Sequence, residues 1–453
     1  NNARCCPTRA TLLTGQYPHA VGMGDMVTLE KAPIQPGAYQ GFLDKQYPTI
    51  AEELKASGYN TFMTGKWHVG ERKEHWPLQR GFEHYFGLIS GASSYYEIIP
   101  AEKGKRHIVL DDKDFDVPND GFYMTDAFTD HAIGYLNDQK ANRSTKPFFL
   151  YVAYTAPHFP LHAYESDIAK YQKLYEQGWD ITRSKRYQKM VQLGLIDKRY
   201  ALTDRPADIT DWKDVADKKQ WVRKMAVYAA MVDRMDQNIG RLITALKANK
   251  QYDNTLIVFM SDNGGCAENM ESRKFNDNTK QIGEKGSYVT YDYPWANVSN
   301  TPFKKYKKFL HEGGMITPCI IQWPAKIKPK AGFNDGIGHV MDLLPTSLEL
   351  AGVPAKALPG ESLSYLWNGK KPSAKTYFWE HEGNKAMRKG NWKLVKDFED
   401  PTWELYDLST DICETKNLAS TQVKVLNEML AEYTVWSNKV GVKEFTKSQN
   451  KSE

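Results

Sequence analysis

The chain has 453 residues, 41% of them hydrophobic and 25% charged, which is the composition of an ordinary globular protein. Its 60 Lys and Arg residues nearly balance 55 Asp and Glu residues, and a net charge of +5 excludes a dedicated nucleic-acid-binding protein with a concentrated basic face. An aromatic content of 12% and the lack of a short repeat exclude collagen-like, coiled-coil and disordered chains, and no apolar run approaches the roughly 18 residues of a membrane helix. We therefore expect neither nucleic-acid binding nor a membrane span.

Short β-rich runs alternate with amphipathic stretches in the first part of the chain, which is the pattern of an α/β sheet covered by helices on both faces. A capping box at Thr49 and Glu52 predicts a helix that ends at Gly58. The longest helix is expected over 220–249, where apolar residues recur every three or four positions and indicate core packing. A shorter helix over 342–352 has an Asp cap and a Gly stop. Strands are expected at 59–63, 147–154, 254–260 and 318–323.

The pattern of expected elements changes beyond about residue 365. Short strands linked by Gly, Asn and Asp turns are expected there, followed by one helix over 421–437. This pattern predicts a small α+β domain on an antiparallel sheet, so that the chain divides into a large domain at 1–365 and a small domain at 366–453. The segment 164–219 is charged and aromatic without a clear period, and we interpret it as an insertion near the mouth of a site. The strands of the small domain are expected at 377–380, 386–388, 392–395 and 405–408.

The strongest motif begins at Cys5 and reads C-C-P-T-R-A-T-L-L-T-G. Six of its positions match the signature C-x-P-S/T-R-x-x-x-x-T-G, and the segment therefore resembles the type I sulfatases of the alkaline phosphatase superfamily, among them the arylsulfatases. In that family a formylglycine-generating enzyme oxidises the first Cys to Cα-formylglycine, so the resemblance implies that Cys5 is the precursor of the nucleophile and a metal contact, braced by Arg9. Read alone, the same residues fit a buried Cys near a turn with Pro7 at a helix start. Cys6 is expected to pack in the core, and no two cysteines have zinc-ligand spacing.

The aldehyde that the resemblance implies has a clear chemical use. It hydrates to a gem-diol, of which one hydroxyl attacks sulfur and the other later loses its proton to release sulfate. A serine in the same place would leave a sulfate ester that is hard to hydrolyse.

Three basic side chains are candidates for the sulfate site. Lys66 and His68 are two residues apart on an extended segment after a predicted strand, so their side chains point to the same side and could bind an anion together. The family has G-K-W-H-x-G here, and the resemblance implies that both residues reach the sulfate and the aldehyde hydrate. His158 follows a predicted strand, where functional residues of such sheets cluster. It matches the family His that contacts the sulfate and protonates the leaving oxygen.

Two further blocks complete the resemblance. Asp262 and Asn263 follow the strand predicted over 254–260, where carboxylate and amide oxygens suit Ca²⁺, although Asp-Asn-Gly-Gly is also ordinary turn chemistry. The family uses D-N-G as two metal ligands. Lys307 stands five residues before an E-G-G sequence, where the family has a sulfate-binding Lys. In the small domain, His381 is expected to reach the site as a substrate contact, with a surface turn as the alternative.

Together these blocks imply an alkaline-phosphatase-like α/β fold, a large mixed sheet with helices on both faces. The implied reaction is hydrolysis of a sulfate monoester to an alcohol or phenol and inorganic sulfate, through formylglycine from Cys5 and a Ca²⁺ ion. One alternative is a phosphomonoester or phosphonate hydrolase of the same superfamily. The other is a non-catalytic protein that binds sulfated glycans and retains Lys66 and Lys307 as anion grips. Aryl, steroid and polysaccharide sulfates all fit as substrates.

The sequence departs from the family at its start. Sulfatases supply two more metal ligands, an Asp-Asp pair, from a first strand that precedes the C-x-P-x-R motif, whereas only four residues precede Cys5 here. The resemblance therefore implies an N-terminally truncated chain that lacks this strand, binds Ca²⁺ poorly and is weakly active or inactive. It also implies a periplasmic or secreted location.

Overall fold

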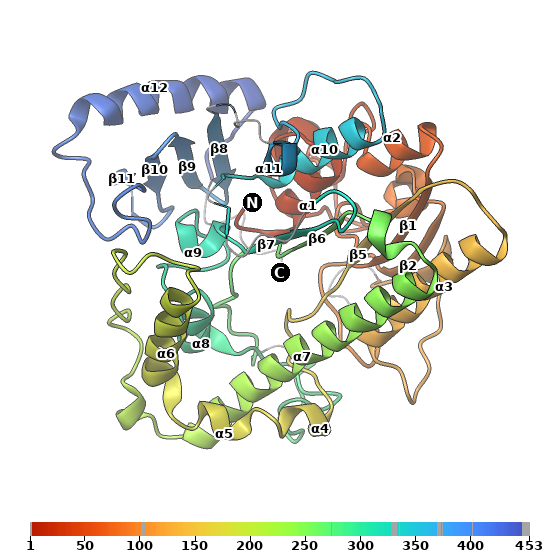
Figure 1. Ribbon diagram of the computed structural model, residues 1–453. Helices are drawn as coiled ribbons and strands as arrows, with labels where there is room; N and C mark the ends of the chain where they lie inside the picture. Colours follow the sequence, from red (N-terminus) through yellow and green to blue (C-terminus); the bar gives the residue numbers. More distant parts are fainter. Residues whose placement is uncertain are drawn as a thin grey trace.

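The computed structural model of the chain has three parts, a large sheet between helices, a two-stranded sheet beside it, and a C-terminal sheet with its own helix (Figure 1). This architecture confirms the expected α/β fold class. The structure describes residues 2–445 apart from 101–104, 273, 328–332, 335, 369–372, 374 and 401.

The strands of the large sheet are β1 Asn60–Gly65, β2 His84–Leu88, β3 Ile108–Leu110, β4 Lys113–Asp114 and β5 Phe148–Ala153. Their order is β4-β3-β2-β1-β5. β1 runs parallel to its neighbours β2 and β5, whereas β3 and β4 continue the sheet antiparallel, so the sheet is mixed. The strands expected at 59–63 and 147–154 are confirmed as β1 and β5.

Helices cover both faces of this sheet, as expected. On one face α1, α2 and α10 enclose a cluster that contains Met63 and Tyr85 of the sheet, and on the other α3 and α7 enclose a cluster that contains Phe86 (Figure 1). Tyr85 and Phe86 are consecutive, so they point to opposite faces. The bounds of these helices are α1 Cys5–Thr14, α2 Ile50–Ala56, α3 Met124–Ala141, α7 Lys218–Ala248 and α10 Leu343–Leu350.

The two short helices with predicted caps differ in how they begin. In α2 the capping box is present, because the Glu52 N–H donates to Thr49 Oγ1 at 3.1 Å and the Thr49 N–H donates to Glu52 Oε2 at 2.6 Å. In α10 the prediction that the Asp342 side chain caps the helix is wrong, because that side chain makes no capping hydrogen bond. The carboxylate of Asp342 accepts instead from the backbone N–H groups of His339 and Glu361, at 2.8 and 2.9 Å, and so ties two loops together.

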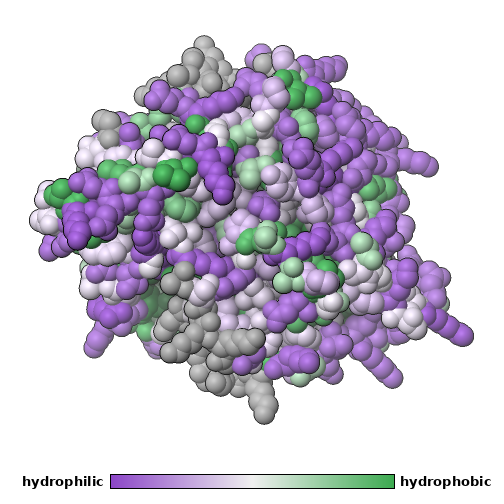
Figure 2. All heavy atoms as spheres, turned by 90° about the horizontal axis from the view of Figure 1, so that it is seen from above, coloured by the Kyte–Doolittle hydropathy of each residue, from purple (hydrophilic) through white to green (hydrophobic). Residues whose placement is uncertain are grey.

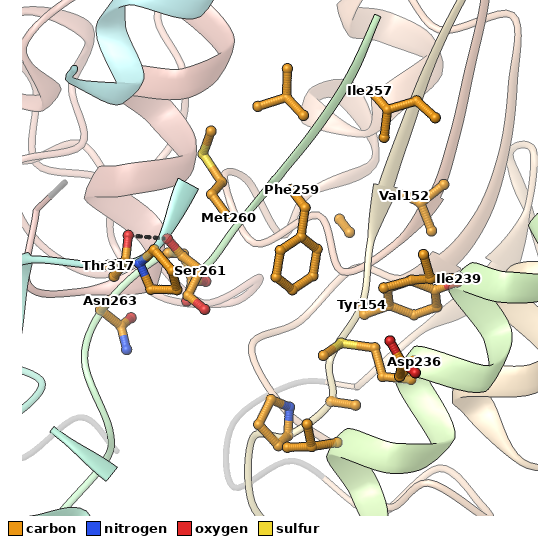
Figure 3. A pocket seen from close by; sticks show the side chains of 18 of the residues that line it. Val152, Tyr154, Asp236, Ile239, Ile257, Phe259, Met260, Ser261, Asn263 and Thr317 are labelled. Carbon is orange, nitrogen blue, oxygen red and sulfur yellow. Dashed lines mark hydrogen bonds between the residues drawn. The ribbon is translucent and has the colours of Figure 1, made fainter. Parts of the chain in front are cut away.

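The predicted strands 254–260 and 318–323 form β6 Ile257–Met260 and β7 Cys319–Gln322, which pair antiparallel as a separate sheet. Among the described residues β6 pairs only with β7, and β5 pairs only with β1. A cavity of about 2250 Å³ lies between β5 and β6. In Figure 3 Val152 of β5, Phe259 of β6 and Ile239 of α7 surround it. Both strands are therefore only half-buried along most of their length.

The segment 164–219, which shows no sequence period, folds into short helices that pack on α7 and on α8. The indoles of Trp179, Trp212 and Trp295 meet there at centroid distances of 4.7 to 6.2 Å. Tyr171 and Leu174 line the same cavity as β5 and β6. The helices of this segment are α4 Glu165–Ile168, α5 Gln172–Tyr175 and α6 Gly178–Gln192. The helix α8, on which α6 packs, spans Asp292–Ser299.

The C-terminal part is an antiparallel sheet in the order β11-β10-β9-β8, with α12 across one face, as expected (Figure 1). A buried ammonium joins it to the rest of the fold, because Lys393 of β10 lies 2.5 Å from Glu312 and 2.8 Å from Glu414. The domain boundary near 365 stays a prediction. The elements are β8 Thr376–His381, β9 Asn384–Lys389, β10 Trp392–Lys396, β11 Glu404–Asp407 and α12 Val423–Val440, preceded by α9 Glu312–Met315 and α11 Tyr365–Asn368.

The outer surface is mainly polar. The face in Figure 2 is covered mostly by hydrophilic side chains, with hydrophobic ones in small separate groups. Within the described part of the chain, no helix combines the length and the apolar character that crossing a membrane requires.

Candidate active site

Cys5 is the first residue of α1, and its side chain is almost completely buried. The N–H groups of a first helical turn have no carbonyl partners within the helix, and the helix dipole favours an anion beside them. Thr8 holds the preceding segment in place, because its hydroxyl accepts from the N–H of Asn2 at 3.0 Å and donates to the carbonyl of Asn2 at 2.9 Å. The first turn of α1 therefore suits a nucleophile or an oxyanion.

The segment that carries Lys66 and His68 leaves β1 at Gly65. A Cβ at Gly65 would lie 2.1 Å from the carbonyl oxygen of Ala153, and the residue has φ of +106°, so only glycine fits this crossing. The next N–H groups then bond to both neighbouring strand ends. Lys66 donates to Ala153 at 2.8 Å, and His68 donates to the carbonyl of Ile89 at 2.9 Å.

This segment brings His68 against the two cysteines of α1. His68 Nδ1 lies 3.3 Å from Cys5 Sγ, and Cys6 Sγ lies 3.3 to 3.4 Å from both ring nitrogens. A hydrogen bond from Cys6 and the charge of Lys66 hold the pKa of the Cys5 thiol well below its ordinary value. Burial and the charge of Lys66 lower the pKa of His68 to about 4, so its imidazole is neutral at pH 7.

Arg9 links α1 to the carboxyl ends of two strands. One terminal nitrogen donates to the carbonyl of Lys66 at 2.7 Å, and the other donates to Asp262 Oδ2 at 3.1 Å. The predicted bracing residue thus connects the end of β1 with the turn after β6.

The turn after β6 and the E-G-G segment contact each other through their glycines. The Gly264 N–H donates to the carbonyl of Gly314 at 2.9 Å, and a Cβ at Gly264 would lie 1.9 Å from the carbonyl oxygen of Gly313. The Lys307 N–H donates to the carbonyl of Gly265 at 3.0 Å. The two predicted blocks are therefore one structural unit, in which the glycines permit the backbone contact that places Lys307.

Asp262 and Asn263 present side-chain oxygens of the kind that a hard cation binds. Asn263 Oδ1 is buried and has no hydrogen-bond partner, and Asp262 presents a carboxylate in the same turn. An amide oxygen and a carboxylate oxygen match the ligands that Ca²⁺ prefers, and they account for two of the six to eight that it takes. These residues fit part of such a site.

Lys307 and His158 form a hydrogen-bonded pair. His158 Nδ1 lies 2.8 Å from the carbonyl oxygen of Phe159, which can only accept, so Nδ1 carries the proton. His158 Nε2 is then free to accept from Lys307 Nζ, at 3.3 Å. Burial and the charge of Lys307 hold the pKa of His158 well below its ordinary value, so the imidazole is neutral at pH 7.

Sequence reasoning missed Glu268, which lies between two cations of the site. Its carboxylate is 2.8 Å from Arg4 and 3.3 Å from Lys307. Burial acts against the charged form, but Lys307 and Arg4 hold the pKa of Glu268 well below its ordinary value. Burial also opposes the Lys307 ammonium, and Cys266 and Glu268 hold its pKa above the usual range. No motif or periodicity marks this Glu, because it follows the D-N-G-G turn in an irregular segment.

His381 makes its closest charged contact with Glu382 rather than with the residues above. Its side chain is 0% exposed and lies 3.4 Å from Glu382, which in turn pairs with Lys308 at 2.9 Å. In this arrangement the imidazole contacts protein groups, and its role as a substrate contact stays a prediction. The residues that the structure does bring together, by direct contact or through one intervening residue, are Cys5, Arg9, Lys66, His68, His158, Asp262, Asn263 and Lys307.

Comparisons with known proteins agree with this site. The sulfatase family model matches residues 1–353, and a model described as N-sulphoglucosamine sulphohydrolase, C-terminal, matches 303–436. An uncharacterised sulfatase of Schizosaccharomyces pombe is 33% identical, over 97% of this chain and 86% of the relative. An arylsulfatase of Klebsiella aerogenes is 34% identical, over 78% of each chain.

Solved structures show the same similarity. The crystal structure of Ps i-CgsB superimposes with a TM-score of 0.69 at 25% identity, over 99% of this chain and 86% of that one. The same protein in complex with k-i-k-neocarrahexaose gives a TM-score of 0.66 at 26% identity. Since the family model spans most of the chain and all the residues gathered at the site, the chain belongs to the sulfatase family of the alkaline phosphatase superfamily and is a sulfuric ester hydrolase.

Proposed function

We propose that the chain hydrolyses a sulfate monoester through a formylglycine derived from Cys5, with Ca²⁺ at Asp262 and Asn263, and that the rate is low because these two residues supply only part of the ligands that Ca²⁺ takes. The observation that carries this proposal is the position of Cys5, at the N-terminus of α1 and 3.3 Å from His68. The charge of Lys66 acts on the same atom. A hydrated aldehyde at this position supplies the hydroxyl that attacks sulfur.

Asp262 and Asn263 would hold the cation through their side-chain oxygens. A bound Ca²⁺ supplies positive charge that stabilises the sulfate oxygens. Arg9 donates to Asp262 and to the Lys66 carbonyl, and so fixes the position of the turn after β6 relative to the end of β1. Lys66 and Lys307 add fixed positive charges, whose value increases as charge shifts in the transition state.

Proton transfer to the leaving oxygen falls to Lys307 and His158 together. A neutral His158 with its proton on Nδ1 has no proton to give from Nε2, and this qualifies its expected role as sole general acid. The Lys307 ammonium donates to that same Nε2. His158 Nε2 would orient the Lys307 ammonium by accepting one of its hydrogens, and Lys307 would donate another proton directly to the leaving oxygen. On the opposite side, His68 Nδ1 would accept the proton of the attacking hydroxyl.

The test begins with the chemical state of Cys5. The chain is produced with and without a formylglycine-generating enzyme, and the peptide that contains Cys5 is analysed by mass spectrometry. We expect conversion of the thiol to the aldehyde only in the first preparation, and sulfate release that rises with the converted fraction. Cys5→Ala should abolish turnover, whereas Cys413→Ala, at a buried cysteine in the C-terminal part, should not. Turnover that is equal with and without conversion would refute the proposal.

The alternatives are separated by two esters of the same phenol. A sulfatase hydrolyses the sulfate ester faster than the phosphate ester, and the reverse preference would indicate the phosphomonoester hydrolase. Binding of the sulfate ester by the converted protein without turnover would indicate the sulfated-glycan binder.

For the natural substrate we propose a sulfated carbohydrate. The support is the structural neighbour in complex with k-i-k-neocarrahexaose, which covers 99% of this chain at 26% identity. A series of sulfated oligosaccharides is compared with an aryl sulfate of equal concentration. The expected result is a higher kcat/KM for at least one oligosaccharide, and a preference for the aryl ester throughout the series would contradict it.

A further inference from the structure

While Cys5 retains its thiol, the site contains a second and chemically different set of metal ligands. One ligand atom each from Cys5, Cys6 and His68 lies within 4.8 Å of the other two, and all three residues are buried. We propose that the unconverted chain binds a soft divalent cation, of the Zn²⁺ and Cd²⁺ class, through these two sulfurs and one ring nitrogen.

The spacing of the atoms supports this assignment. A tetrahedral ion with Zn–S bonds of about 2.3 Å and Zn–N bonds of about 2.0 Å separates the sulfur and nitrogen by about 3.5 Å. The Cys5 and Cys6 sulfurs lie 3.3 and 3.4 Å from His68 Nδ1. Cys6 Sγ is equally close to Nε2, at 3.3 Å, and therefore lies over the ring face, so binding requires the imidazole to turn until Nδ1 points at the ion.

The protein fixes the backbone that carries these three side chains. Both cysteines begin α1, and the backbone of His68 is fixed by its bond to Ile89. A Cβ at Gly91 would lie 2.5 Å from the His68 ring, so the ring packs directly on a glycine backbone. The thioether of Met26, 3.7 Å from Cys6 Sγ, adds another soft atom beside the set.

Thiolate and imidazole ligands select a different cation from the one expected at Asp262 and Asn263. Sulfur and nitrogen donors favour Zn²⁺ and its heavier relatives, whereas oxygen donors favour Ca²⁺. Oxidation of Cys5 to formylglycine removes one sulfur, so the two states of the chain differ in the metal they prefer. This last consequence rests on the proposed function, whereas binding by the unconverted chain does not.

The experiment uses the whole chain produced without the formylglycine-generating enzyme, with the Cys5 thiol verified by mass spectrometry. Cd²⁺ is titrated while the ultraviolet thiolate-to-cadmium absorbance is recorded, and Zn²⁺ is titrated against a chromophoric chelator. We expect one equivalent of each to bind. Cys6→Ser and Cys5→Ser should each weaken binding by about 10- to 100-fold, the loss typical of a damaged metal site. The matched control Cys413→Ser should bind like the parent chain. Unchanged affinity in Cys6→Ser would overturn the proposal.

A second measurement needs no variant and so does not depend on folding of a mutant. The parent chain is alkylated with and without Zn²⁺, and the modified cysteines are identified by mass spectrometry. Protection of Cys5 and Cys6, but not of the exposed Cys319, is expected. Equal alkylation of Cys5 in both samples would contradict the proposal. Because neither readout involves turnover, failure here is distinct from failure of the sulfatase chemistry.

Discussion

At the scale of single residues, the candidate site contains two neutral imidazoles, His68 and His158, beside the charged ammonium group of Lys307. Burial lowers the pKa of His68 and of His158, so both rings are neutral at pH 7 and each can accept a hydrogen bond at one ring nitrogen. Lys307 is equally enclosed but stays protonated, because Cys266 and Glu268 act against the effect of burial. Glu268 is thus one of two acidic groups that keep the Lys307 ammonium charged.

Removing that carboxylate gives a pH-dependent prediction. In Glu268→Gln, burial acts on Lys307 with one of its two acidic partners removed, so the pKa of Lys307 falls and the alkaline limb of the kcat/KM profile moves to lower pH. We also expect kcat/KM at neutral pH to fall about 10-fold, as for other residues that position a charged group. The matched control is Glu271→Gln, which removes a partner of Lys224 instead. An alkaline limb that stays in place would refute the role of Glu268.

Glu71 provides a prediction about stability. Burial raises the pKa of this carboxyl to about 7, although the hydroxyl of Ser90 donates to it at 2.9 Å. The folded-state pKa lies above the unfolded one, so there is no cost below about pH 4, and folding loses stability as the pH rises to 7. Glu71→Gln keeps an acceptor for Ser90 and removes this loss.

The free energy of unfolding of the variant should therefore equal that of the parent chain near pH 4 and exceed it by about 3 kcal/mol at pH 8, because the folded-state pKa of about 7 lies about 2.5 above the unfolded one and a difference of one corresponds to about 1.36 kcal/mol. Urea unfolding at both pH values measures the difference. Glu74→Gln, at an exposed carboxyl three residues on, is the control. A difference that is the same at pH 4 and pH 8 would contradict the linkage.

At the scale of elements, the contact between β10 and α9 depends on one buried ammonium. Lys393 is 0% exposed and pairs with Glu312 at 2.5 Å and Glu414 at 2.8 Å. Lys393→Met leaves two carboxylates buried without their cation, which costs about 3 to 5 kcal/mol in comparable pairs. The midpoint of urea unfolding should fall accordingly.

A surface pair provides the matched control for this change. Lys389 lies one strand away and pairs with Glu432, and both side chains are exposed. Lys389→Met should cost about 1 kcal/mol or less. Adding Glu312→Gln and Glu414→Gln to Lys393→Met should restore part of the lost stability, since the charges are then gone together. No recovery in the triple variant would show that packing, rather than charge, explains the loss.

Elements defined by local sequence were predictable, and those defined by distant contacts were not. The capping box of α2 and the turns between β8, β9 and β10 are encoded within a few residues, and the structure confirms them. The short helices of 164–219 instead bury their indoles against α7 and α8, so their apolar residues follow no single period. The Asp342 carboxylate is used by a loop nineteen residues away, which no local cap rule includes.

The site shows the same division. Motif spacing located its basic residues and its predicted metal ligands, because each sits at a fixed offset from a strand end or a glycine turn. Glu268 and Arg4 were missed, since their roles arise only when a loop and the start of the chain meet at Lys307.

At the scale of the whole molecule, Lys66 follows β1 of the large sheet, and Lys307 lies in a loop bonded to the turn after β6. These two sheets share no hydrogen-bonded ladder in the described part of the chain. Inorganic sulfate bound between these residues would therefore stabilise the folded state, by about 1.4 kcal/mol for each tenfold excess over Kd. We expect Tm to rise with millimolar sulfate in the parent chain but not in Lys307→Met. Chloride at equal ionic strength is the control, and an equal rise in the variant would indicate a general salt effect.

The guanidinium of Arg9 has a consequence for how accurately such a site is built. One of its terminal nitrogens binds the Lys66 carbonyl and the other binds Asp262, across the space between the sheets. The distance between those nitrogens is a covalent dimension that thermal motion barely changes. The distance between the Lys66 carbonyl and the Asp262 carboxylate is therefore set by the planar geometry of one side chain. A lysine, which ends in a single nitrogen, would leave that distance undefined.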